Sequence, residues 1–404
     1  MAIIVKKFGG TSVGSLERIE AVAEQIIATK QQGHQVVAVL SAMSGETNRL
    51  TQMAKQLDTN PSPRELDMLL SSGEQVSISL LAIALIKRGY SAVSLLAHQI
   101  GLQTNSRFNK ARILDIDNTR MLTELQQGHI VIVAGFQGVD FEGNITTLGR
   151  GGSDTSAVAI ATSLRAKECQ IYTDVDGVYS TDPRVDANAK KLPHVSFDEM
   201  LEMASTGAKV LQTRSVEFAG HHKMPLHVLS SFSEGDGTQI TFEQSENKSH
   251  PVTAITYLND EVLFSISHQG DAAYIRTEIF AQLAENDIEI DMLSESQIND
   301  KLTDLQFTVQ HSEKHKTELV LSQQSLKLEH FNWHARQHLV KISAIGNGMK
   351  SHCGVASEFF DCLKQQNIEL FLVSTAEIKI SVLVLQTEME RAVQALHKKF
   401  KLNC

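Results

Sequence analysis

Cysteine and basic residues are both scarce in this sequence of 404 residues. The four cysteines, Cys169, Cys353, Cys362 and Cys404, are scattered without a CxxC pair, which argues against a zinc site and a disulfide framework. We expect reduced thiols and a cytoplasmic location. The 37 lysines and arginines are outnumbered by 47 acidic residues, giving a formal charge of -10. Because that charge repels phosphate backbones and anionic lipid, no nucleic-acid or membrane partner is expected.

Long apolar runs and an export signal are also lacking. The longest apolar run, Val76 to Ile86, contains serines and is shorter than the roughly 20 residues that span a bilayer. The first residues lead directly into a strand-like segment, Ile3 to Val5, followed by lysines and glycines. That order differs from a signal peptide, so we expect a soluble protein.

The first 230 residues alternate short β-rich runs with segments of helical periodicity. The continuous apolarity of the runs predicts parallel strands buried on both faces, and the alternation predicts an α/β sandwich. The predicted strands are Ile3–Phe8, Val36–Leu40, Ala92–Leu96, Ile130–Ala134 and Ile171–Thr173. The predicted helices are Ser15–Lys30, Arg64–Arg88, Ile116–Gln127 and Ser156–Leu164, with glycines following at Gly33, Gly89 and Gly128.

A polar stretch and an internal repeat define the predicted domains. From about Thr238 to His250 the composition becomes polar and loop-like, so we place a catalytic domain at 1–245. Beyond it, Glu285–Ile298 aligns with Gln365–Ile378 at an offset of 80 residues. Each copy opens with a strand and a glycine turn, at Val262–Gly270 and Val340–Gly348. Two small modules are therefore predicted at 252–335 and 336–404, with exchange of strands between them allowed.

The first motif is KFGGTS, Lys7 to Ser12, at the predicted end of a strand. Glycines let backbone amides approach an anion closely, and the lysine adds a mobile positive charge. The spacing matches neither the P-loop nor GxGxxG. The alternative is a plain strand-to-helix turn with a solvent-facing lysine.

The second motif is TLGRGGSDTSA, Thr147 to Ala157, which carries Arg150 and Asp154 in a glycine-rich loop that opens a helix. Such a loop favours a phosphate or carboxylate ligand. The alternative is that Ser153 or Asp154 caps a helix beginning near Thr155.

The third motif is YTDVDGVYSTDPR, Tyr172 to Arg184, a strand that leads into an acidic loop. An EF-hand is the competing interpretation. Counting from Asp174, the twelfth position is Val185, so the bidentate glutamate that a calcium loop needs is missing and we reject calcium.

With SAMSGETN (Ser41 to Asn48) and SSGEQVS (Ser71 to Ser77) between them, these motifs closely resemble those of the aspartate kinases of the amino-acid kinase superfamily. The C-terminal repeat resembles that family's paired ACT domains. The resemblance implies an amino-acid kinase α/β/α sandwich followed by two ferredoxin-like ACT α+β modules. It also implies ATP-dependent phosphorylation of the side-chain carboxylate of L-aspartate to 4-phospho-L-aspartate, the first step towards lysine, threonine and methionine.

The resemblance assigns roles to individual residues. It implies that Lys7 offsets charge on the transferring phosphoryl group and that Asp154 orients this lysine. The implied aspartate-binding residues are Ser41, Thr47, Glu74, Arg150, Gly151, Gly152 and Ser153. The implied ATP-binding residues are Lys7, Phe8, Gly9, Gly10, Thr173, Asp174, Tyr179, Asp182, Arg184 and Lys209. Mg²⁺ is expected to be carried mainly by the ATP phosphates and not by a protein-only metal site.

Two of these assignments have plainer alternatives. Glu74 is by itself a helix-surface carboxylate, and Thr47 is by itself a helix cap. No general base is expected, because the acceptor carboxylate is already a nucleophile at neutral pH.

The second C-terminal copy follows the ACT pattern, whereas the first departs from it at His268, Gln269 and Gly270 and around Tyr274–Thr277. We expect feedback inhibition by lysine, threonine or both, with the modules also forming a homodimer or larger homo-oligomer. The alternative is that the modules only dimerise the protein.

Rival functions are another amino-acid kinase, for glutamate, acetylglutamate or a nucleotide, and a sensor built on an inactive kinase. KFGGTS with two ACT copies argues against the first. The presence of Lys7, Arg150, Asp154 and Lys209 argues against the second. A fusion to homoserine dehydrogenase needs several hundred more residues, so we expect a monofunctional kinase.

Overall fold

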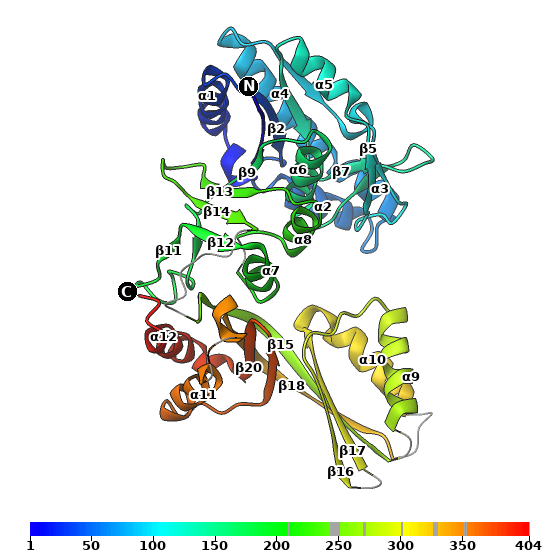
Figure 1. Ribbon diagram of the computed structural model, residues 1–404. Helices are drawn as coiled ribbons and strands as arrows, with labels where there is room; N and C mark the ends of the chain where they lie inside the picture. The colour runs from blue at the N-terminus through cyan, green and yellow to red at the C-terminus, as the bar shows by residue number, and fades with distance from the viewer. Residues whose placement is uncertain are drawn as a thin grey trace. The chain divides into compact units, whose positions relative to one another are not determined.

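The computed structural model describes residues 1–208, 210–242, 251–269, 272–299, 302–325, 330–350, 352 and 354–403. These residues form two compact units (Figure 1). Unit 1 lies within Met1–Val178, Lys191–Ser205 and Lys209–Glu246. Unit 2 takes the short segments Tyr179–Lys190 and Thr206–Ala208 together with residues after Asn247. The second unit therefore includes two pieces of chain from the predicted catalytic region.

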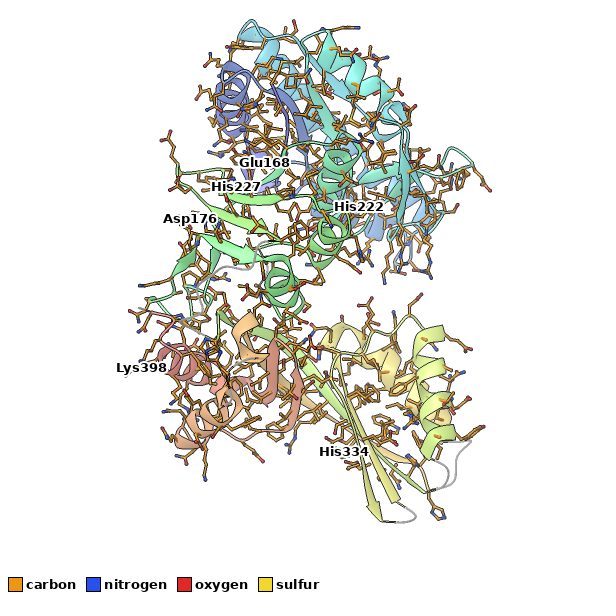
Figure 2. The ribbon with its side chains drawn as sticks, viewed as in Figure 1. Glu168, Asp176, His222, His227, His334 and Lys398 are labelled. Carbon is orange, nitrogen blue, oxygen red and sulfur yellow. The ribbon has the colours of Figure 1, made fainter. Side chains whose placement is uncertain are left out.

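Unit 1 is built on an eight-stranded, mostly parallel sheet with the strand order β12-β14-β13-β9-β1-β2-β6-β3. Its neighbouring strands β9 and β13 carry Glu168 and His227 (Figure 2). The strands of this sheet are β1 (Ile3–Phe8), β2 (Gln35–Leu40), β3 (Ala92–Leu95), β6 (Ile130–Ala134), β9 (Glu168–Thr173), β12 (His194–Ser196), β13 (Leu226–Ser230) and β14 (Thr238–Thr241). All five predicted strands are thus confirmed, and the α/β fold with them.

Helices cover both faces of this sheet. The helices of unit 1 are α1 (Leu16–Gln31), α2 (Glu46–Leu57), α3 (Pro63–Leu70), α4 (Ser72–Lys87), α5 (Thr119–Gln126), α6 (Gly152–Ser163), α7 (Phe197–Ser205) and α8 (Thr213–His221). The apolar sides of α1 and α4 share one core with alternate residues of β2 and β6. Helix α6 contacts β1, β2 and β9. Ser15 caps α1 by accepting a hydrogen bond from the Arg18 amide at 3.3 Å.

A smaller sheet has the order β5-β4-β7-β8. Its strands are β4 (Leu102–Thr104), β5 (Ile113–Ile116), β7 (Gln137–Val139) and β8 (Ile145–Thr147). The short strands β10 (Val178–Tyr179) and β11 (Lys191–Leu192) flank the segment that groups with unit 2. Two 3₁₀ turns complete the unit, η1 (Thr11–Val13) and η2 (Ala97–Ile100).

The predicted helix at 64–88 is two helices, α3 and α4, that meet at Ser71. There the Gln137 side-chain amide donates to the Ser71 carbonyl at 3.1 Å, a contact from outside the helix at the break. By length and composition alone, Pro63–Lys87 is apolar enough to cross a membrane, and 56% of its most apolar window is buried. The core helix of a soluble protein has the same properties, and α4 buries Ile78, Leu81 and Leu85.

Two other predicted boundaries were wrong. The polar stretch was expected to begin at Thr238, but Thr238–Thr241 is β14, which pairs with β13. Hydrogen bonds to β13 stabilise this strand although few of its residues are apolar. The predicted helix at 116–127 begins later, at Thr119, because the Asp117 carboxylate accepts a hydrogen bond from the Thr119 amide at 3.0 Å. Residues 243–250, where the domain boundary was predicted, lie outside the described residues.

Unit 2 contains one six-stranded antiparallel sheet of order β16-β17-β15-β18-β20-β19. Its strands are β15 (Ala254–Gln269), β16 (Leu293–Asn299), β17 (Leu302–Gln310), β18 (Asn332–Ile345), β19 (Leu372–Ala376) and β20 (Lys379–Leu385). Its helices are α9 (Ala272–Glu285), α10 (Lys314–Ser325), α11 (Val355–Gln365) and α12 (Met389–Lys399), with 3₁₀ turns η3 (His311–Glu313), η4 (Asn347–Lys350) and η5 (Gln386–Glu388).

Two long strands, β15 and β18, are shared by both halves of this sheet. Val262–Gln269 of β15 pairs with β17, whereas Ala254–Leu258 pairs only with β18 beside β20. Each half therefore has the ferredoxin-like order of four strands. The outer strand of each half is one end of a long strand whose other end belongs to the other half. The register shifts between Leu258 and Leu263, where Asp260 has a φ of 65°. Such a bulge lets one strand serve two halves.

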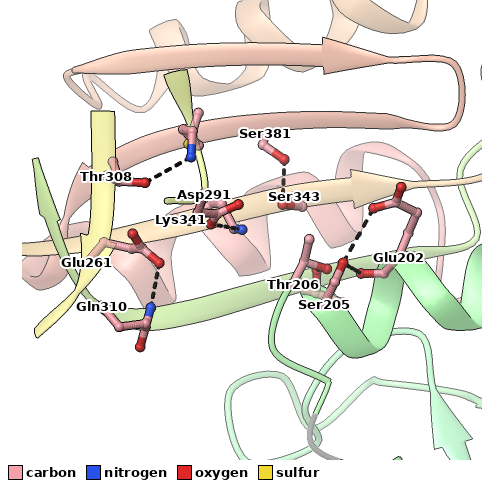
Figure 3. Close-up of polar contacts among 12 residues, drawn as sticks. Glu202, Ser205, Thr206, Glu261, Asp291, Thr308, Gln310, Lys341, Ser343 and Ser381 are labelled. Atoms are coloured by element: carbon pink, nitrogen blue, oxygen red, sulfur yellow. Dashed lines mark hydrogen bonds and ion pairs between the residues drawn. The ribbon is translucent and has the colours of Figure 1, made fainter. Parts of the chain in front are cut away.

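Each half has its own hydrophobic core beneath its helices. Phe264 and Phe307 lie in the core with α9 and α10, and Phe359 and Leu396 lie in the core with α11 and α12. The opposite face of the sheet is partly polar (Figure 3). There the buried Lys341 ammonium pairs with Asp291, and the Ser343 and Ser381 hydroxyls lie 2.7 Å apart.

Candidate active site

The predicted site residues of unit 1 gather at one edge of the large sheet. Strands β1, β2, β6 and β9 are parallel neighbours, so their carboxyl ends meet at the same edge. The chain runs from β1 to β2 on one side and reaches β9 on the other. The carboxyl end of β1 is therefore a topological switch point, where open α/β sheets bind ligands.

Lys7 and Asp154 form an ion pair at this edge. Lys7 is the penultimate residue of β1, Asp154 lies in the first turn of α6, and the Lys7 Nζ atom is 2.6 Å from Asp154 Oδ1. Both side chains are largely buried. The solvent-facing alternative for Lys7 is therefore wrong. The residue that precedes α6 is Gly151, and no side chain caps the helix. Ser153 and Asp154 lie inside the first turn, so the capping alternative is also wrong.

Close backbone packing brings the first turns of α4 and α6 to this edge. At Gly135, just after β6, a Cβ atom would lie 2.9 Å from Ser153 Cβ. At Gly73, in the first turn of α4, a Cβ atom would lie 2.8 Å from Ala42 Cβ. Contacts below 3.0 Å are not tolerated, so only glycine fits at either position. The N-terminus of α6, whose amides favour anions, is thus fixed beside the strand ends.

Glu74 is a buried carboxylate with one unpaired oxygen. Its side chain is on α4, the residue is 2% exposed, and its Oε1 accepts a hydrogen bond from the Ala42 amide at 3.0 Å. Within the described part of the chain, its buried Oε2 has no hydrogen-bond partner. Burial raises the pKa of Glu74 to about 8. The helix-surface alternative for Glu74 is wrong, and a cationic ligand would satisfy this carboxylate.

The remaining predicted aspartate-binding residues lie just after β2, in the first turn of α2, and in the loop and first turn of α6. Ser41 directly follows β2, and its carbonyl accepts the Ser77 hydroxyl at 2.8 Å. Thr47 is the second residue of α2, whose N-cap is Gly45, so Thr47 is not a cap. Arg150 is exposed on the loop before α6, and Gly151 there has a φ of 70°.

Sequence reasoning missed Asp67, a fully buried carboxylate on α3. Its oxygens accept hydrogen bonds from the Thr147 amide at 2.8 Å, the Thr147 hydroxyl at 2.6 Å and the Asn109 amide at 2.9 Å. Thr147 ends β8, three residues before Arg150. Asp67 therefore ties the Arg150 loop to the helical segment that carries Glu74. The sequence feature that could have identified Asp67 is its position among the apolar residues of ELDMLL.

The residues predicted to bind nucleotide fall into both units. Phe8 is buried and stacks on Tyr172 with ring centroids 4.7 Å apart, and Thr173 ends β9 beside the exposed Asp174. Tyr179, Asp182 and Arg184 belong to the segment grouped with unit 2. The Arg184 guanidinium donates to Asp182 at 2.7 and 3.0 Å and lowers the pKa of Asp182 to about 2. Lys209 lies outside the described residues.

Metal ligands do not cluster in the part of the chain that the structure describes, where no group of three or more histidine, cysteine or acidic residues is placed to hold an ion. The two cysteines described as free thiols, Cys169 and Cys362, are buried in different units.

A model of the amino acid kinase family matches residues 2–230. An aspartate kinase of Pseudomonas putida is 50% identical over 404 residues, covering all of this chain and 98% of the relative. The chain belongs to the aspartate kinases of the amino acid kinase family. Aspartokinase 2 of Bacillus subtilis is 46% identical over 403 residues, covering all of this chain and 98% of that relative. A model of ACT domains matches residues 342–400 of this kinase.

Among solved structures, Escherichia coli aspartokinase III in complex with aspartate and ADP has a TM-score of 0.84 and 26% identity, over 98% of this chain and 99% of that one. The same enzyme with lysine and aspartate has a TM-score of 0.77 and 27% identity, again over 98% and 99% of the two chains. The expected fold of an amino-acid kinase followed by ACT modules is confirmed.

Proposed function

We propose that this kinase transfers the γ-phosphoryl group of ATP to the side-chain carboxylate of L-aspartate, giving 4-phospho-L-aspartate and ADP. The buried Glu74 carries the proposal, because its Oε2 lacks a partner among the described residues and free aspartate brings an ammonium. Arg150 would bind a carboxylate of the same substrate, with Ser41, Thr47 and residues 151–153 around it.

In the proposed reaction, a carboxylate oxygen of aspartate attacks the γ-phosphorus while the bond from that phosphorus to the β–γ bridging oxygen breaks. The products are a carboxylic–phosphoric anhydride and ADP, and no proton has to move. Catalysis then depends on position and charge. Lys7 supplies the positive charge for the phosphoryl oxygens, and Asp154 holds the Lys7 Nζ atom at 2.6 Å.

The residues present fit a nucleotide phosphate chain. The Lys7 ammonium and the N-terminus of α6 both favour anions at the carboxyl end of β1, and Gly9 leaves that ammonium uncovered by a side chain. We propose that Gly9, Gly10, Thr173, Asp174, Tyr179, Asp182, Arg184 and Lys209 bind ATP. When bound, Mg²⁺ would offset phosphate charge while held mainly by the phosphates and water.

The decisive experiment supplies ATP and magnesium with one acceptor at a time and traps acyl phosphate with hydroxylamine. We expect hydroxamate with L-aspartate and none with L-glutamate or N-acetylglutamate. Hydroxamate with another acceptor, or none with any, would refute the assignment of substrate. Glu65→Gln, on the exposed face of α3, is a suitable control for Glu74→Gln because it changes a neighbouring carboxylate outside the site.

We further propose that this kinase catalyses the first step towards lysine, threonine and methionine in the cytoplasm. Lysine, threonine or both would inhibit it by feedback. Two ferredoxin-like halves in unit 2 support a sensing role, and Escherichia coli aspartokinase III has been solved with lysine. Full activity with millimolar lysine plus threonine would contradict it. In that case the halves would serve only to form a homodimer or larger homo-oligomer, which sedimentation measures directly.

A further inference from the structure

The segment Tyr179–Lys190 is held by the half of unit 2 that contains α11 and α12. The Ile255 amide of β15 donates to the Ser180 carbonyl at 2.8 Å, and the Tyr257 hydroxyl donates to Asp182 Oδ2 at 2.9 Å. The Gln394 amide of α12 donates to the Val185 carbonyl at 2.7 Å. The Val185 side chain packs against the core of this half. The conformation of the proposed nucleotide-binding segment therefore depends on contacts with the rest of unit 2.

At the centre of these contacts is a buried cluster of Ser180, Asp186 and His397. His397 is on α12 and is 0% exposed, whereas the next residue, Lys398, faces solvent (Figure 2). The His397 Nδ1 atom is 2.9 Å from Asp186 Oδ2, and its Nε2 atom is 2.9 Å from the Ser180 hydroxyl. In the tautomer protonated at Nδ1, Nε2 accepts the proton of the Ser180 hydroxyl.

The same three residue types form hydrolytic triads, but this cluster is closed. Ser180 is 1% exposed, and its oxygen also accepts a hydrogen bond from the Lys190 amide at 3.0 Å. The Leu402 carbonyl lies 3.4 Å from it. A nucleophile needs room for a substrate on its oxygen, and these groups occupy that space. The cluster of Ser180, Asp186 and His397 therefore has a structural role and does not catalyse hydrolysis.

We propose that His397 is a positioning residue for nucleotide binding, an inference that rests on the proposed function. Ser180 and Asp186 are the two ends of the turn that carries Asp182 and Arg184, and one imidazole bonds to both ends. Asp186 also accepts hydrogen bonds from the Asn188 amide and side chain, each at 2.9 Å, which fixes the chain beyond the turn. Without His397, the turn loses the imidazole of α12 that lies between its two ends.

The loss should weaken nucleotide binding and leave aspartate binding unchanged, because Glu74 and Arg150 belong to unit 1 and the segment does not. A turn that occupies its binding geometry only one-tenth of the time binds tenfold more weakly. We therefore expect His397→Gln to raise the dissociation constant of ADP and the KM of ATP about tenfold. The KM of aspartate should stay within about twofold of wild type, a split that general destabilisation does not produce.

The matched control is Ser343→Ala, which removes a buried polar contact of 2.7 Å in the same half without touching Tyr179–Lys190 (Figure 3). ADP binding is measured by calorimetry on the full chain, and both KM values by the hydroxamate assay. Unchanged ADP binding in folded His397→Gln, or an equal loss in Ser343→Ala, would overturn the proposal.

If His397→Gln does not fold, Ser180→Ala decides the matter, because it removes the hydroxyl contacts of Ser180 with His397 and the Lys190 amide and leaves the pair of His397 and Asp186. About threefold weaker ADP binding supports the proposal, and unchanged binding refutes it. The proposed function fails separately, when wild type makes no aspartyl hydroxamate although it binds ADP. The variants then still test the role of His397 through ADP binding alone.

Discussion

Replacing Glu74 with glutamine should stabilise the ligand-free kinase at alkaline pH while abolishing aspartate binding. Burial raises the pKa of Glu74 from its ordinary 4.5 to about 8. In the folded protein the carboxyl therefore stays protonated over a pH range in which the unfolded chain has already ionised. The folded state binds the extra proton, so this stability is complete below pH 4.5 and is lost as pH rises through 8.

The size of the effect follows from that difference in pKa. At about 1.36 kcal/mol per pH unit, moving the pKa from 4.5 to about 8 corresponds to roughly 5 kcal/mol. Glutamine stays neutral, so Glu74→Gln should gain up to that amount over wild type at pH 8 and nothing near pH 4.5. For a protein of 404 residues the gain corresponds to an increase in Tm of about 6 °C.

Thermal unfolding of wild type, Glu74→Gln and the control Glu65→Gln between pH 4.5 and 9 tests this reasoning. The control should follow wild type at every pH. Aspartate should stabilise wild type and release close to one proton at pH 7, because its ammonium favours the ionised Glu74. The reasoning is refuted if Glu74→Gln keeps the pH slope of wild type, or if it binds aspartate with undiminished affinity in calorimetry.

Other predictions concern charge and position in unit 1. Lys7→Ala and Asp154→Ala should each lower turnover at least about 100-fold in a protein that still folds, because both act on charge in the transition state; near-normal kcat in either variant would exclude its role. Asp67→Asn should raise the KM of aspartate about tenfold, because an amide in place of one oxygen opposes donors from Thr147 and Asn109. Asp140→Asn is its control, since Asp140 accepts amides at the far end of the same β7–β8 hairpin, and an equal effect of both variants would contradict the positioning argument.

The residues of the candidate site could be singled out from the sequence because they lie in short motifs. KFGGTS and TLGRGGSDTSA each combine a strand end or loop with a helix start, and parallel strands bring such ends together. The pairing of Lys7 with Asp154 was implied by the family resemblance, and the two side chains do form an ion pair. Burial of Glu74 did not, because it depends on Ala42 and Gly73, which come from different elements and meet only in the folded unit.

Residues that act across long separations were beyond sequence reasoning. Asp67 bonds to Thr147 across 80 residues, and Ser180 bonds to His397 across 217 residues. Thr147 and Ser180 each belong to a motif, but Asp67 and His397 belong to none, so no local signal connects the members of either pair. The sequence repeat likewise did not predict that both halves share β15 and β18. The two copies align equally well whether each keeps its own outer strand or takes one from the other copy.

The separation between Ser180 and His397 also sets an order of events during synthesis. At about 5 to 20 residues per second, a ribosome needs roughly 10 to 40 s to make the 217 residues between them. All strands of the large sheet are complete before α12 exists, yet the turn carrying Asp182 and Arg184 still lacks its imidazole. If His397 positions this turn as proposed, a nascent chain gains firm nucleotide binding only after unit 2 has been made.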